Sequence, residues 1–273
     1  MKFGLIGHPI AHSLSPALFK AGYDGRYPYE LIQTEDFEQA YARFLSDYDG
    51  INVTAPFKEP AFRKADILSE ECSLIGATNL LVKTPEGIKA FNSDYLGVRL
   101  WLEDVGKKAQ QSQWLNIKPT ISIVGLGGAG KAAAAAAHSL GFDLILMNRD
   151  MSKAEAMAAR LDSETEHINV IKVRPLEEFA ECFKEADIII YNIPSAIPQL
   201  AEITVHTDCR AKHILEANYK DPSFNKELID KLLGDNPNSS YTSGKTWLLY
   251  QAVTGYELFT GEKPDLARMS AVI

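Results

Sequence analysis

The chain has 273 residues, of which 46% are apolar, and it carries a formal net charge of −8 at pH 7. This length suits two domains, and the apolar content can support a hydrophobic core in each. The excess of acidic residues argues against nucleic acid or an anionic membrane surface as a general partner, so any anionic ligand must be held by local groups.

The cysteine and histidine residues indicate neither a disulfide framework nor a metal site. Cys72, Cys182 and Cys209 are scattered and form no C-x-x-C pair, which favours a reducing compartment. The six histidines show no metal-ligand spacing. No run approaches a membrane span, and the N-terminus enters a strand-like run without a signal peptide. We therefore expect a cytoplasmic, soluble protein that binds no metal.

The first segment predicts a strand over Lys2–Ile6 and then a helix that starts near Ser15. Ser15 suits the N-cap of that helix, and Pro16 suits its first position. This interpretation leaves Ser13 unexplained. Two hydroxyls two residues apart, beside a helix N-terminus, also form a small anion site suited to a carboxylate.

The next segment predicts a strand over Tyr29–Gln33, an amphipathic helix over Phe37–Ser46 and a strand over Gly50–Val53. Thr54 and Lys58 lie just beyond the end of the last strand. A lone lysine at such a place is usually a solvated turn residue. It can also donate and accept a proton at a reacting oxygen when burial favours its neutral form.

Two further polar segments have an ordinary and a functional interpretation. Asn79 follows Gly76-Ala77-Thr78 and is a common turn residue, but its amide can also bind a substrate hydroxyl. Ser93 or Asp94 would be a good N-cap for a helix over Tyr95–Asp104. Taken one at a time, each of these residues has an ordinary structural explanation.

The polar stretch Val105–Pro119 predicts a link to a second domain, which opens at Thr120–Val124, a short apolar strand. Glycines in G-x-G-x-x-G spacing follow, and then an alanine-rich run with high helix propensity. Strand, glycine turn and helix in this order are typical of a dinucleotide site, because backbone N–H groups and the helix start can approach a pyrophosphate. The candidate cofactor-binding residues of this turn are Gly125, Gly127, Gly128, Ala129 and Gly130.

The end of the following strand, Asp143–Met147, indicates which cofactor is bound. NAD enzymes usually place an acidic residue there for the ribose 2′-OH. This chain has Asn148 and Arg149, with Lys153 one turn further on, and the planar guanidinium suits a 2′-phosphate. NADP is therefore predicted. Asp150 argues against NADP, because its carboxylate would repel the 2′-phosphate or compete with it for Arg149.

The rest of the chain predicts three more strands and two helices. We expect strands over Ile168–Val173, Asp187–Asn192 and His213–Glu216, and helices over Pro175–Glu185 and up to Phe259, the last ended by Gly261. Asp235–Ser239 reads as a loop. Gly244-Lys245-Thr246 suggests a P-loop, but the pattern fails, because Ser239 stands at its first glycine and no apolar strand leads into it.

In combination, the polar segments resemble the shikimate dehydrogenase family. G-H-P-I at 7–10 with H-S-L-S-P at 12–16 resembles its N-terminal signature, although Phe19-Lys20 departs from a frequent His-Asn pair. Residues 52–58 resemble its N-V-T-x-P-x-K at every fixed position. Residues 76–80 resemble G-A-x-N-T with Leu80 for Thr, and residues 92–97 resemble N-T-D-x-x-G with Ser93 for Thr.

The second half carries weaker parts of the resemblance. Glu216 and Tyr219 are similar to the family's D-x-x-Y, with Glu for Asp and the following proline one place later, at Pro222. The family usually has Asn-Ala-Thr/Ser where this chain has Asn192-Ile193-Pro194, so Ile193-Pro194 departs from its pattern. Gly244, Leu248 and Gln251 fit G-x-x-M-L-x-x-Q, with Trp247 for Met.

The resemblance implies a role for each of these residues. Ser13 and Ser15 would hold the substrate carboxylate, which Tyr219 would also reach. Lys58 would be the general acid and base, with Asp94 facing it across the substrate. Further residues would bind the ring (Thr54, Asn79 and Gln251) or the cofactor (Asn192 beside the nicotinamide ribose, and Gly244).

These observations predict an α/β protein with two domains. Residues 1–102, completed by C-terminal helices over 241–273, would form an α/β substrate domain, and residues 103–240 a Rossmann-type nucleotide domain with a doubly wound parallel sheet. The predicted activity is reversible hydride transfer between NADP and C3 of shikimate, giving 3-dehydroshikimate, in the chorismate and aromatic amino acid pathway. We expect a small-molecule substrate, no nucleic acid or membrane partner, and a monomer or homodimer.

Two other interpretations remain open. One is a quinate or dual quinate/shikimate dehydrogenase that uses NAD, for which Asp150 leaves room, although Ser15 speaks against quinate because quinate-specific relatives tend to carry Thr there. The other is a non-catalytic, NADP-sensing binding protein of the same fold. Loss of Lys58 or Asp94 would favour it, and both are present.

Overall fold

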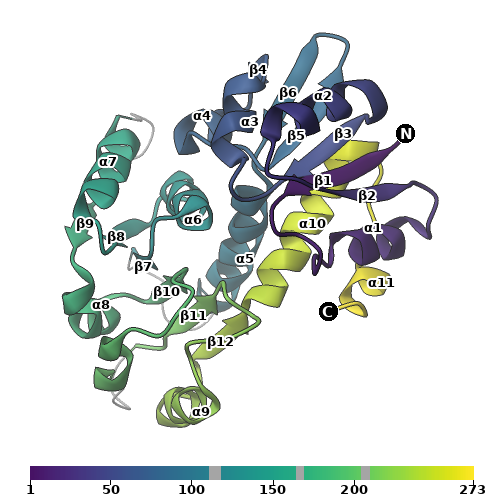
Figure 1. Ribbon diagram of the computed structural model, residues 1–273. Helices are drawn as coiled ribbons and strands as arrows, with labels where there is room; N and C mark the ends of the chain where they lie inside the picture. The colour runs from purple at the N-terminus through teal and green to yellow at the C-terminus, as the bar shows by residue number, and fades with distance from the viewer. Residues whose placement is uncertain (111–117, 164–168, 204–209) are drawn as a thin grey trace. The chain divides into compact units, whose positions relative to one another are not determined.

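The computed structural model describes residues 1–110, 118–163, 169–203 and 210–273. The chain forms two compact units (Figure 1). The first consists of Met1–Gly97 with Leu248–Ile273, and the second of Val98–Trp247. Each unit has its own six-stranded sheet.

The sheet of the first unit has the strand order β2-β1-β3-β5-β6-β4. The strand β1 runs parallel to β2 and β3, whereas β5 runs antiparallel to β3 and β6. The strands are β1 (Phe3–Gly7), β2 (Tyr29–Gln33), β3 (Gly50–Val53), β4 (Ile67–Leu68), β5 (Leu80–Thr84) and β6 (Gly87–Phe91). The helices are α1 (Ser15–Tyr23), α2 (Phe37–Asp47), α3 (Lys58–Lys64), α4 (Glu70–Ile75) and α11 (Leu266–Ser270), with the first part of α5 (Ser93–Gln110) and the last part of α10 (Gly244–Thr260).

Alternate residues of these strands face two different cores. Ile6 and Leu81 belong to a core with Phe44 of α2 and Ala61 of α3. Neighbouring positions in the strands, such as Leu80, belong to a second, aromatic-rich core that α1, α10 and α11 complete. The period-two alternation of the strands thus buries both faces of the sheet.

The second unit has an entirely parallel sheet in the order β12-β11-β10-β7-β8-β9. Numbered within the unit, this is the order 3-2-1-4-5-6 of a Rossmann fold, which confirms the predicted fold class. The strands are β7 (Thr120–Val124), β8 (Asp143–Met147), β9 (Ile171–Arg174), β10 (Ile188–Tyr191), β11 (His213–Glu216) and β12 (Ser240–Ser243).

Helices cover both faces of this sheet. Figure 1 shows α6 (Gly128–Ser139) and α7 (Met151–Asp162) on one side of the strands, and α8 (Phe179–Glu185) and α9 (Lys226–Asp235) on the other. Two short 3₁₀ turns, Leu176–Glu178 and Pro198–Glu202, join α8 on its side. The parallel strands are therefore buried on both faces, as their continuous apolar runs predict.

Two expectations about elements were wrong, and the strand β12 was not predicted. The stretch from Val105 is not a link at its start, because α5 continues to Gln110; residues 111–117 of the expected link lie outside the described part. The strand β12 was missed because its sequence, SYTS, is polar. The helix predicted over Pro175–Glu185 begins as a 3₁₀ turn and becomes α-helical at Phe179.

Candidate functional site

The polar residues predicted in the first unit lie next to strand ends that share one edge of its sheet. Because β1 and β3 are parallel, the loop after Gly7, which carries the two serines, and the loop after Val53 start at the same edge. The strand β5 is antiparallel, so Asn79, just before it, lies at that edge too. Since β6 is antiparallel to β5, it ends at the same edge, close to Asp94.

The two serine hydroxyls are hydrogen-bonded to each other at the start of α1. Ser13 Oγ accepts a hydrogen bond from the Ser15 backbone N–H at 3.2 Å and donates to Ser15 Oγ at 3.1 Å. The predicted capping role of Ser15 is wrong, because Leu14 occupies the N-cap and makes no side-chain cap. With Ser15 inside the helix, its hydroxyl has no capping duty and can serve a ligand.

Two tyrosines lie near Ser15, of which Tyr256 is buried and Tyr29 half-buried. The Tyr256 hydroxyl donates to the Ser15 carbonyl at 3.1 Å, and the Tyr29 hydroxyl donates to Asn52 Oδ1 at 2.8 Å. Burial raises the pKa of both phenols, and the neighbouring Ser15 side chain acts in the opposite direction. Asn52 in turn donates to the Asn79 carbonyl at 3.4 Å, so hydrogen bonds join Tyr29 to Asn79 through Asn52.

Lys58 and Asp94 form an ion pair between the first turns of two helices. Lys58 is the first residue of α3 and Asp94 the second of α5, and Lys58 Nζ contacts Asp94 Oδ2. Their side chains are only 22% and 11% exposed. Lys58 is therefore not a solvated turn lysine, and a proton donor and acceptor lies beside a carboxylate in a partly water-excluded place.

The start of α5 is capped by neither of the residues expected to do so. Asn92 Oδ1 accepts from the Tyr95 N–H at 3.1 Å, which is the capping contact. Asn79 Oδ1 accepts from the Ser93 N–H at 2.7 Å. The Asp94 carboxylate is thus directed to Lys58, and the Asn79 amide nitrogen is left as the group that can donate to a ligand hydroxyl.

Close backbone packing brings Thr54 and Gln251 to the same region. A Cβ at Gly97, one turn after Asp94 on α5, would lie 2.6 Å from the Gln251 nitrogen, so only glycine lets α10 approach here. A Cβ at Gly7 would lie 2.3 Å from Thr54 Cγ2. The first unit therefore holds every predicted substrate residue except Tyr219, from β1 through α10.

In the second unit, the glycine turn between β7 and α6 is shaped by backbone contacts. Gly125 has a φ of +90°, and a Cβ at Gly130 would lie 1.9 Å from the Gly125 oxygen. Gly127 is the N-cap of α6, and a Cβ there would meet nothing within 4 Å. Among the glycines of the turn, two are required by the fold, whereas Gly127 faces open space that an anion can occupy.

Asn192 lies beside this turn at the point where the strand order reverses. It follows β10, which pairs with β7, and a Cβ at Gly130 would lie 3.5 Å from Asn192 Nδ2. The amide donates to the Ile190 carbonyl at 3.3 Å, but Asn192 Oδ1 is buried without a partner among the described residues. A buried acceptor at the switch point of a Rossmann sheet fits a dinucleotide that donates to it.

Of the polar residues after β8, Asn148 and Asp150 bond the backbone, whereas the Arg149 side chain is exposed. Asn148 Oδ1 accepts from the Leu126 N–H at 3.1 Å and so ties this loop to the glycine turn. Asp150 is the N-cap of α7, accepting from the Ser152 N–H at 3.2 Å and the Ser152 hydroxyl at 2.6 Å. These bonds hold the pKa of Asp150 below its usual range. Arg149 is exposed beside it, and Lys153 Nζ lies 3.9 Å from the Asp150 carboxylate.

The last two predicted residues of this unit, Tyr219 and Gly244, follow β11 and β12. Tyr219 is half-buried, and burial raises the pKa of its phenol. A Cβ at Gly244 would lie 2.1 Å from the Ala217 oxygen, which gives this glycine a packing role in addition to the one predicted. Sequence reasoning missed Asn218, whose amide donates to Pro194 O at 3.0 Å and Asp221 O at 2.6 Å. Its only sequence signal is that of a turn asparagine.

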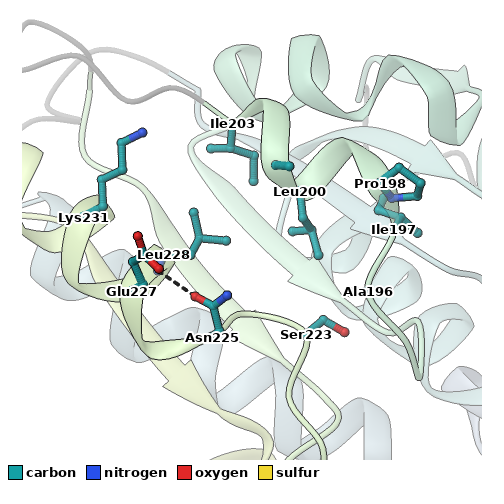
Figure 2. A pocket seen from close by; sticks show the side chains of 11 residues that line it. Ala196, Ile197, Pro198, Leu200, Ile203, Ser223, Asn225, Glu227, Leu228 and Lys231 are labelled. Carbon is teal, nitrogen blue, oxygen red and sulfur yellow. Dashed lines mark hydrogen bonds between the residues drawn. The ribbon is translucent and has the colours of Figure 1, made fainter.

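A separate cavity of about 480 Å³ lies between the Pro198–Glu202 turn and α9 (Figure 2). Its wall is mainly apolar, with Ile197, Leu200 and Leu228, and Asn225 there caps α9 by accepting from the Leu228 N–H at 2.9 Å. None of the predicted site residues lines it. It is therefore not the candidate site.

Three further findings bear on the predicted class of protein. Within the described ranges, no group of three or more His, Cys, Asp or Glu side chains is arranged to hold a metal ion. The same part of the chain contains no helix that is both long and apolar enough to cross a membrane. Cys72 and Cys182 are buried free thiols, and Cys209 lies outside the described residues.

Comparison with known proteins gives matches along most of the chain. Residues 5–81 match the family model of the shikimate dehydrogenase substrate binding domain, and residues 107–216 match that of shikimate / quinate 5-dehydrogenase. A shikimate dehydrogenase (NADP(+)) of Thermotoga maritima is 32% identical over 214 residues, which cover 76% of this chain and 74% of the relative.

Two more relatives cover nearly the whole chain. A shikimate dehydrogenase (NADP(+)) of Haloarcula marismortui is 29% identical over 280 residues, 98% of this chain and 96% of that protein. The crystal structure of Mycobacterium tuberculosis shikimate dehydrogenase superposes with a TM-score of 0.80 at 26% identity, covering 99% of this chain and 98% of that one. Together with the glycine turn and the Lys58–Asp94 pair, these matches place the chain in the shikimate dehydrogenase family.

Proposed function

We propose that this protein is an NADP-dependent shikimate dehydrogenase, which reversibly reduces 3-dehydroshikimate to shikimate in the pathway to chorismate and the aromatic amino acids. The observation that carries the proposal is the part-buried Lys58–Asp94 ion pair at the edge where the serines, Thr54 and Asn79 also emerge. Relatives with the name shikimate dehydrogenase (NADP(+)) along nearly the full chain support it.

In this proposal each side chain of the first unit has one task. The Ser13 and Ser15 hydroxyls donate to the substrate carboxylate, and Tyr219 is assigned a further donor role there. Asn79 donates its amide to a ring hydroxyl, and Thr54 and Gln251 fix the ring. Directional donors of this kind hold the reacting carbon in one orientation, which lowers the entropic part of the barrier.

Proton transfer at the reacting oxygen falls to Lys58. In the reduction, its ammonium gives a proton to the carbonyl oxygen, and in the oxidation its amine takes that proton back. Asp94 stabilises the ammonium and orients both it and the substrate hydroxyl. NADP supplies or accepts the hydride, so the chain's own residues contribute position and the proton.

The second unit offers the features that NADP requires. The glycine turn and the start of α6 suit the pyrophosphate, with Gly128 and Ala129 in the first turn of the helix, and Asn192 Oδ1 can accept from the nicotinamide side. Arg149 is the exposed cation for the 2′-phosphate, with Lys153 nearby. Asp150 does not compete as strongly as its charge suggests, because its carboxylate is hydrogen-bonded to Ser152.

The proposal also covers the domain bounds, the class of substrate, and the location and oligomeric state of the protein. The substrate domain comprises residues 1–102 and 241–273, and the nucleotide domain residues 103–240. The substrate is a small molecule, and the protein works in the cytoplasm as a monomer or homodimer.

Initial rates in a two-by-two design test the function: shikimate and quinate, each with NADP and with NAD. The highest kcat/KM is expected for shikimate with NADP. A preference for quinate would contradict the proposed substrate, and a preference for NAD would contradict the role of Arg149. No oxidation of either polyol, with NADPH still bound, would instead support the non-catalytic binding protein.

A further inference from the structure

Glu216 is a fully buried carboxylate that has no task in the mechanism above. It is the last residue of β11, and none of its surface is exposed. A buried carboxylate is costly unless several donors satisfy it. Three donors do so here: the Ser223 N–H bonds Oε1, the Phe224 N–H bonds Oε2 at 3.3 Å, and the Tyr241 hydroxyl bonds Oε2 at 2.6 Å.

Two of these bonds join the two ends of the segment that follows β11, residues 217–224. Its first residue continues from Glu216, and the amides of its last two residues return to the Glu216 side chain. Hydrogen bonds from backbone amides to an ionised carboxylate are stronger than neutral ones. Burial and the neighbouring carboxylate raise the pKa of Tyr241, so its hydroxyl remains the donor. The 217–224 loop is thus a ring closed by a side chain.

The closed 217–224 loop carries Tyr219 and touches the loop after β10. Asn218 donates to the Pro194 carbonyl at 3.0 Å, and the Ala217 N–H donates to the Tyr191 carbonyl at 2.9 Å. The Phe224 ring packs edge-on against Tyr191, with ring centres 5.5 Å apart. The base of the loop is therefore bonded to the end of β10 and, through Asn218, to Pro194, two residues after Asn192.

We propose that Glu216 is a positioning residue: by closing the 217–224 loop it holds Tyr219 at the substrate and, through Asn218 and Pro194, holds the segment after Asn192 at the nicotinamide side of the cofactor. The inference rests on the proposed function for its ligands, but the closure itself is independent of that function. A merely structural Glu216 would affect stability and leave both Michaelis constants unchanged.

Two substitutions distinguish the contribution of the Glu216 side-chain length from that of its negative charge. Glu216→Asp keeps the charge but shortens the side chain by one methylene, so it cannot bond both returning amides. Glu216→Gln keeps the length, but its amide end must face one of the N–H donors. For each variant we expect KM for shikimate to rise about tenfold or more, which corresponds to the loss of one strong hydrogen bond, while kcat changes less. KM for NADP should rise in the same direction.

A variant of Tyr219 tests whether Glu216 affects the KM for shikimate through the 217–224 loop. If Glu216 acts on shikimate through Tyr219, the double variant Glu216→Gln/Tyr219→Phe should raise KM for shikimate no further than the larger single effect. Multiplied effects would show that Glu216 does not act through Tyr219 and would overturn that part of the proposal.

The chain offers a matched control in Asp187→Asn. Asp187 is also fully buried and precedes β10 in the same sheet, but it lies at the opposite edge, where it accepts from the Thr120 N–H at 2.9 Å and pairs with Arg210 at 3.0 Å. This variant should lower the Tm and leave both KM values within about twofold. If the Glu216 variants lower the Tm in the same way with both KM values unchanged, the positioning role is wrong.

A measurement without catalysis keeps the proposal separate from the proposed function. Hydrogen exchange of the ligand-free protein should show faster exchange of the Ser223 and Phe224 amides in Glu216→Gln than in the wild type, and NADPH should bind more weakly. If the wild type does not oxidise shikimate, the proposed function fails while these two results still support the closure. Unchanged protection of both amides in Glu216→Gln would overturn it.

Discussion

The two units of this protein present their functional groups in different ways. In the first unit the predicted residues meet through side chains: Ser13 with Ser15, Lys58 with Asp94, and Asn79 with the start of α5. In the second, the glycine turn contributes backbone and open space, and Arg149 stands exposed.

The difference follows from the chemistry of the two ligands proposed. A ring with several hydroxyls and one carboxylate must be read by donors and acceptors of fixed direction, which only specific side chains supply. A pyrophosphate is an anion that backbone N–H groups and a helix start can bind, so it needs few specific side chains. Changes to the Lys58–Asp94 pair should therefore alter the chemical step, whereas changes to the glycine turn should alter cofactor affinity and stability.

The largest effect is expected from Lys58→Met. Removing the acid and base should lower kcat by about 10²-fold or more, the scale of general acid–base catalysis, while NADPH binding stays unchanged. Lys64→Met is the control, because Lys64 lies at the other end of α3, where it pairs with surface Glu38 at 2.8 Å. Wild-type kcat in Lys58→Met would remove this lysine from the mechanism.

Gly130→Ala tests the claim that the second unit works through its backbone. The new Cβ would lie 1.9 Å from the Gly125 oxygen, so the turn must deform, at a cost of about 1–3 kcal/mol of stability. NADPH affinity should fall at least tenfold, as judged by fluorescence titration. Gly234→Ala, at a position where a Cβ meets nothing within 4 Å, should change neither property. A normal Tm and affinity in Gly130→Ala would contradict the backbone role.

A smaller effect is expected from Arg149→Ser, which should sharpen the distinction between NADP and NAD. Losing one charge-assisted contact at an exposed site should raise KM for NADP about five- to tenfold and leave KM for NAD unchanged. Arg160→Ser, at another exposed arginine near the end of α7, controls for the change in net charge. Equal rises for both cofactors would show that Arg149 does not contact the 2′-phosphate.

The smallest effect is expected from Asp150→Asn. Asparagine caps a helix as well as aspartate does, so the Tm should not change. Removal of the charge beside Arg149 should lower KM for NADP by about twofold, since screened surface charges act weakly. A loss of NADP affinity in this variant would mean that the carboxylate helps to orient Arg149 rather than opposing the phosphate.

The sequence was most informative where one pattern had one physical meaning. The strands β2, β3, β7, β8 and β11 have the predicted bounds, and the glycine turn joins β7 to α6 as expected. Capping was less predictable: Ser15 and Asp94 have good capping chemistry, but Leu14 is the N-cap of α1, and Asn92 makes the capping contact of α5. A polar side chain near a helix start has several available partners, and only tertiary packing decides among them.

Other features depend on contacts that sequence patterns do not carry. The strand β12 is polar yet pairs fully with β11, so its backbone and not its hydropathy determines its place. The approach of α10 to Gly97 and the closure of the 217–224 loop by Glu216 both join residues that a local pattern cannot connect. For Asp150, the sequence showed a charge, whereas the structure shows a helix cap.

The most direct test of the proposed catalytic pair is a double-mutant cycle on kcat with Lys58→Met, Asp94→Asn and both together, with shikimate and NADP. If the two residues act as one unit, the double variant should be no slower than the slower single variant. If the two losses multiply instead, Lys58 and Asp94 act independently, and the ion pair at the edge of the first unit is not the catalytic centre.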